Sequence, residues 1–70
     1  MSERKLEFGD WDDDPIVFWD TGKEAWAWVF RSGAWEEVDG EEYAEASKGA
    51  RLMSESAFEN IFGKLPSLPS

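Results

Sequence analysis

The 70-residue chain contains no cysteine and no histidine. It therefore cannot form a disulfide or a thiolate metal site, and it lacks both the commonest zinc ligand and the usual general base of enzymes. Nucleophilic triads depend on such a base, and the six glycines are scattered rather than gathered in a phosphate-binding loop. We expect no catalysis, no cofactor and no bound metal, and a fold that is stabilised by packing alone.

Long apolar runs are also missing from the chain. No segment approaches the roughly 18 apolar residues that suggest a membrane span. The opening residues, MSERKLE, lack the apolar core of a secretion signal. The sequence therefore predicts a cytoplasmic protein that does not bind membranes.

Basic side chains are scarce. Seven Lys and Arg stand against 16 Asp and Glu, which gives a net charge of −9. Binding to phosphate backbones or anionic lipids depends on an excess of positive charge, so we expect no direct contact with nucleic acid. The charge favours instead a protein partner that is basic or rich in arginine.

Aromatic side chains are abundant, at 16% of the chain: five Trp, five Phe and one Tyr. Each large ring buries roughly 150 to 250 Å² in a core. Disordered chains are poor in aromatics, so the composition predicts a globular domain despite the high charge.

Alternating hydrophobicity predicts an antiparallel β-meander in the first half of the chain. Pro15 opens a β-branched and aromatic run, and the following run places Trp26, Trp28 and Phe30 on one face of a strand. Short turns rich in Gly, Asp and Ser separate the runs. The predicted strands cover residues 15–20, 24–30 and 34–38, with a short first strand at residues 5–8.

Helix-start signatures appear after this meander. Asp39 with Glu42 forms the acidic variant of a capping box, and Gly49 is placed to end the helix. A second helix is predicted to begin at Ser54, to end at Gly63, and to bury a stripe of three side chains, Phe58, Ile61 and Phe62.

The predicted fold class is α+β: a small antiparallel meander of three to four strands, followed by two short C-terminal helices packed on one face. Residues 1–64 form the domain, and residues 65–70 form an extended tail that contains proline.

One face of the predicted sheet lacks a cover. The helices are expected to lie on the face of Trp26, Trp28 and Phe30, while the other face of that strand shows only Ala25, Ala27 and Val29. Apolar surface of this kind marks an interaction site. A second copy of the chain in a homodimer, a different protein, or the tail folding back are three candidate covers.

The segment from Asp10 to Asp20 holds the candidate binding residues, because it carries aromatic rings beside carboxylates. Asp10, Asp12 and Asp14 match the opening of a calcium loop, but Pro15 and Thr21 stand where that loop needs glycine and glutamate, so the match predicts no metal site. Trp11 is the leading candidate because it lies in a charged loop, where it is not expected to be part of the core. The candidate site consists of Trp11, Asp12, Asp13, Asp14, Trp19 and Asp20.

These features predict a small, acidic, non-catalytic module that binds a protein through an aromatic sheet face rimmed by carboxylates. The alternative is a stoichiometric inhibitor or nucleic-acid mimic of the kind that mobile elements encode. Such a mimic would occupy a basic groove on its target protein.

Overall fold

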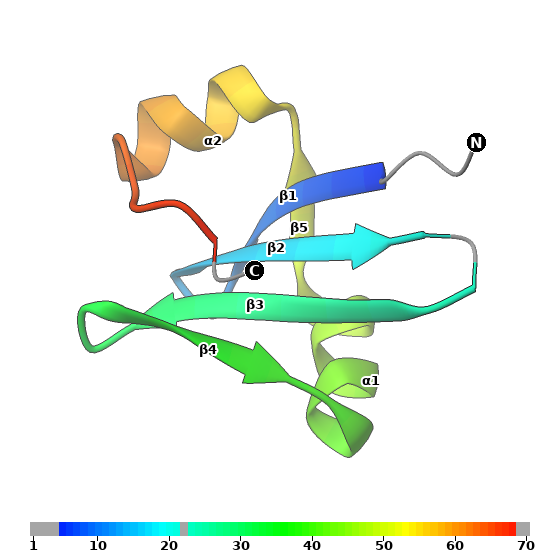
Figure 1. Ribbon diagram of the computed structural model, residues 1–70. Helices are drawn as coiled ribbons and strands as arrows, with labels where there is room; N and C mark the ends of the chain where they lie inside the picture. The colour runs from blue at the N-terminus through cyan, green and yellow to red at the C-terminus, as the bar shows by residue number, and fades with distance from the viewer. Residues whose placement is uncertain (1–4, 22, 69–70) are drawn as a thin grey trace.

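Five antiparallel strands and two helices make up the computed structural model, which describes residues 5–21 and 23–68 (Figure 1). In chain order the elements are β1 (Lys5–Trp11), β2 (Asp14–Asp20), β3 (Ala25–Arg31), β4 (Ala34–Val38), α1 (Gly40–Gly49), β5 (Arg51–Met53) and α2 (Glu55–Phe62). The strands form one sheet in the order β4-β3-β2-β1-β5. The predicted α+β class with an antiparallel sheet is confirmed.

The first strand is longer than the sequence predicted, and the charged loop after it is a tight hairpin. β1 runs to Trp11, and Trp11 pairs with Asp14, so that only Asp12 and Asp13 lie between the strands. Both have positive φ, 56° and 69°, which is the conformation of a type I′ hairpin turn. Aspartate tolerates this left-handed conformation better than most residues do.

The strand β5 was not predicted, because three residues are too few to display a periodicity. It lies between the helices and pairs with β1 from Phe8 to Asp10. Gly9 makes this pairing close: a Cβ at Gly9 would lie 2.9 Å from the carbonyl oxygen of Arg51. Because β5 is added to the predicted strands, the sheet has five strands where three or four were expected.

The α1 face of the sheet contains the main core. Its members follow from the strand register: Ile16 opposes Val29, and Phe18 opposes Ala27. Ala46 of α1 packs into the same cluster, and Tyr43 of α1 meets Phe18 edge-on at 5.9 Å between ring centroids. The face of Ala27 and Val29, for which the sequence predicted no cover, is thus buried by α1.

The second helix packs on the other side, the aromatic face. Phe58 of α2 is 5% exposed and lies 5.2 Å from the ring of Phe8, which opposes Val17 in the sheet. Val17 and Phe18 are consecutive, so they point to opposite faces of β2. The prediction that both helices pack on one face was therefore wrong: a strand that is apolar on both sides takes a cover on each.

The two helices begin differently. The Ser54 hydroxyl accepts a hydrogen bond from the amide of Ala57 at 3.2 Å, so α2 has the predicted cap, and Gly63, with φ of 78°, follows its last residue. Asp39 makes no side-chain cap bond, so the predicted capping box does not form. Asp39 has the extended backbone of an N-cap residue, with φ of −142°, but Gly40 follows it with a φ of 60°, outside the helical region.

Candidate functional site

Large rings from β2, β3 and β4 line the aromatic face. Strand alternation and register bring Trp19 opposite Trp26, with ring centroids 5.0 Å apart. At the other end Phe30 meets Trp35 edge-on at 5.1 Å. The rings that β2, β3 and β4 contribute to this face, all half-buried, are Trp19, Trp26, Trp28, Phe30 and Trp35.

The C-terminal tail returns across this face. It leaves the end of α2 and runs back toward β2 and β3 (Figure 1). The indole Nε1 of Trp35 donates a hydrogen bond to the carbonyl oxygen of Pro66 at 3.0 Å. A groove of about 230 Å³ remains between the tail and a floor of apolar side chains that includes Phe8, Val17 and Phe58. The tail was one candidate cover for the face of Ala27 and Val29, and it lies instead on the aromatic face.

Trp11, the leading candidate of the sequence analysis, lies on the α1 face. It is half-buried and packs against the core cluster. The guanidinium carbon of Arg31 lies 5.9 Å from its ring centroid, a cation–π distance. The prediction that Trp11 lies outside the core was therefore wrong, because the hairpin turn at Asp12 and Asp13 places Trp11 in the sheet, where its ring packs against the core cluster.

The structure separates the candidate residues into groups. Trp11, the last residue of β1, pairs with Asp14 at the start of β2, whereas Trp19 and Asp20 are at the end of β2. Trp11 and Trp19 are on opposite faces of the sheet. Asp12 and Asp13 are exposed at the hairpin tip. The two tryptophans of the candidate site thus do not belong to one surface.

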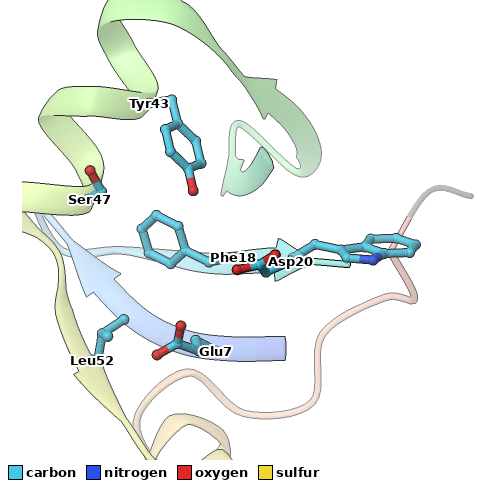
Figure 2. Close-up of a pocket in the computed structure, with 7 residues that line it drawn as sticks. Glu7, Phe18, Asp20, Tyr43, Ser47 and Leu52 are labelled. Carbon is cyan, nitrogen blue, oxygen red and sulfur yellow. The ribbon is translucent and has the colours of Figure 1, made fainter. Parts of the chain in front are cut away.

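A pocket of about 180 Å³ lies on the α1 face where β1, β2 and α1 meet. Figure 2 shows the carboxylates of Glu7 and Asp20 and the hydroxyl of Tyr43 gathered around the Phe18 ring. Ser47 and Leu52 complete the lining, together with Trp19. Sequence reasoning placed Asp20 and Trp19 in the site but missed Glu7, although the alternation in β1 sets Glu7 on the opposite face from Leu6 and Phe8.

Most of the acidic side chains face solvent. Arg31 binds Glu42 at 3.0 Å and approaches Glu36 at 3.8 Å, and all three side chains are at least a third exposed. Exposed pairs of this kind contribute little to stability. Among the residues that the structure describes, no cluster of three or more acidic side chains is arranged to hold a metal ion.

Within the described ranges no helix is long and apolar enough to cross a membrane. Comparison with known proteins adds no relative: no family model, no curated protein and no solved structure matches the chain.

Proposed function

We propose that the chain is a non-catalytic protein-binding module whose aromatic face binds a basic or arginine-rich protein. The observation that carries this proposal is the tail: the face holds an extended segment of its own chain through a tryptophan N–H and an apolar groove. Aromatic-lined grooves bind extended peptides in the same way, with an indole N–H donating to a peptide carbonyl. A second protein segment can use the same chemistry.

Carboxylates border this face and favour a cationic partner. Glu37 lies opposite Trp28 in the ladder between β3 and β4 and is exposed. Glu55 and Glu59 line the groove beneath the tail. A guanidinium beside these groups gains both ionic contact and stacking on an indole.

Affinity capture from a native cell lysate tests the proposal, with Trp26→Ala as the face variant and Ile61→Ala as the control. Ile61 is 60% exposed on α2 and is not part of the aromatic ring row, so its loss should leave capture unchanged. We expect Trp26→Ala to reduce the captured partner at least tenfold, because buried aromatic anchors dominate interface energies. Circular dichroism checks that both variants fold. Full capture by a folded Trp26→Ala protein would contradict the proposal.

The hairpin end, with Trp11 and its neighbouring aspartates, stays a predicted site, and the same capture tests it. If Trp11→Ala loses the partner while Trp26→Ala retains it, binding belongs to the α1 face and the hairpin. If Trp26→Ala alone loses it, the aromatic face is the site.

The alternative of a nucleic-acid mimic is favoured by one feature of the surface. Asp12 and Asp13 at the hairpin tip and Glu41 and Glu45 on α1 are all exposed carboxylates. A mimic would bind a nucleic-acid enzyme with affinity that falls steeply with salt and would compete with DNA or RNA. Binding through the aromatic face keeps its apolar contacts when salt screens its ionic ones, so it should weaken less with salt and should not be competed by DNA or RNA. Capture at two salt concentrations, with and without added nucleic acid, separates the two functions.

A further inference from the structure

The pocket on the α1 face places two carboxylates diagonally across β1 and β2. Glu7 opposes Phe18, and Asp20 lies two residues beyond Phe18 on the same face. Diagonal neighbours of this kind in an antiparallel sheet are about 7 to 8 Å apart at their backbones. The pocket between them is about 180 Å³, enough for one side chain rather than a large ligand.

The other walls of the pocket are apolar and aromatic. Phe18 is 9% exposed and forms the floor, with Tyr43 edge-on against it. Leu52 is 52% exposed at the rim. Two hydroxyls, of Tyr43 and Ser47, lie on the α1 side, and the Ser47 hydroxyl donates to the carbonyl of Ala44, so its oxygen can accept a further hydrogen bond.

We infer that this pocket binds an arginine side chain of the basic partner. A guanidinium carries five N–H donors in a plane, which suits acceptors on two sides, and its weakly hydrated faces stack on aromatic rings. Its aliphatic stem matches Leu52 and the edge of Phe18. An anionic ligand is repelled by Glu7 and Asp20, and an apolar ligand would displace water from their carboxylates without adding a hydrogen bond.

Arginine is favoured over lysine by the shape of the pocket. An ammonium is a compact, strongly hydrated charge that meets one carboxylate but does not stack on Phe18. The net charge of −9 adds long-range attraction for either cation and so does not distinguish them.

The inference rests on the proposed function in one respect only, that the arginine belongs to a protein partner. The pocket is on the α1 face, whereas the proposed binding face is the other side of the sheet. Trp19 belongs to both surfaces, because it lines the pocket and its ring lies beside Trp26. The variants are therefore made at Glu7 and Trp26, each of which belongs to one surface.

A titration of the full chain followed by two-dimensional amide NMR tests the inference. The probes are three peptides, Gly-Arg-Gly, Gly-Lys-Gly and Gly-citrulline-Gly, each acetylated and amidated. We expect saturable shifts centred on Phe18, Asp20 and Tyr43 with the arginine peptide, at least threefold weaker binding of lysine, and at least tenfold weaker binding of citrulline, which keeps the shape but loses the charge.

Matched variants locate the binding. Glu7→Gln keeps the volume of an exposed side chain and should weaken the arginine peptide at least fivefold, whereas Glu41→Gln, at an exposed position of α1 outside the pocket, should not change it. Equal binding of the citrulline peptide, an unchanged affinity in Glu7→Gln, or shifts confined to Trp26 and Trp28 with none at Phe18 would each overturn the inference. Trp26→Ala should leave the arginine peptide bound, so a failure of the aromatic face does not imply a failure of the pocket.

Discussion

Two isoleucines occupy opposite environments in the molecule. Ile16 is 0% exposed in the cluster beneath α1, whereas Ile61 is 60% exposed on α2. The helical stripe in the sequence predicted that Ile61 is buried, and that prediction was wrong. α2 meets the sheet through Phe58, which contacts both Phe8 and Phe62. The buried face of the helix is therefore narrower than the hydrophobic pattern indicated.

The isoleucine pair provides a stability test. Ile16→Ala should lower the free energy of unfolding by about 2 to 5 kcal/mol, because a cavity is added to the lost transfer energy. Ile61→Ala should change it by less than about 0.5 kcal/mol, as exposed substitutions do. Urea denaturation of both proteins measures the difference, and equal losses would mean that the core does not lie where the structure places it.

Residue-level prediction was weakest at Trp11, whose neighbours in sequence are nearly all charged. A local window around it predicts a solvated loop. The ring packs on the core because two aspartates adopt the left-handed turn that pairs β1 with β2. The groups that surround the ring, Arg31 and the core cluster that includes Ala46, lie far from Trp11 in the chain, so no local composition reveals its burial.

Helix caps distinguish the two helices at the scale of elements. Ser54→Ala should cost about 1 kcal/mol, because the hydroxyl satisfies the amide of Ala57 at the first turn of α2. Asp39→Ala should cost only a few tenths of a kcal/mol, since Asp39 makes no cap bond and contributes only its charge near the helix start. Urea denaturation of the two variants checks the order, and a larger cost at Asp39 would show that α1 begins with the capping box after all.

The elements were predictable where the periodicity ran long enough. The strands β2, β3 and β4 and the start of α2 match the sequence pattern within one residue. β5 has three residues and was missed, and its position is decided by the edge of β1 and the missing side chain at Gly9. An edge strand of this kind is selected by its partner rather than by its own sequence.

The charge acts on the molecule as a whole. The described part of the chain extends only 30 × 28 × 21 Å, so at about 10 mM salt, where the screening length is roughly 30 Å, nearly every carboxylate repels every other. Raising NaCl to about 150 mM shortens that length to roughly 8 Å and should raise the free energy of unfolding by on the order of 1 kcal/mol. Urea denaturation at the two salt concentrations measures the change; a fall in stability would mean that the ion pairs of Arg31 outweigh the repulsion.

The sequence by itself determined the α+β class, the antiparallel strands, the cap of α2 and the scarcity of positive charge, because each depends only on local residue spacing or on composition. Only the tertiary structure decided which face each helix covers, where the tail lies, and that Glu7 and Asp20 share a pocket with Phe18 and Tyr43. β2 and β3 are apolar on both faces, so alternation could not say which side receives α1 and which receives α2. Contacts between residues far apart in the chain determine which face each helix covers.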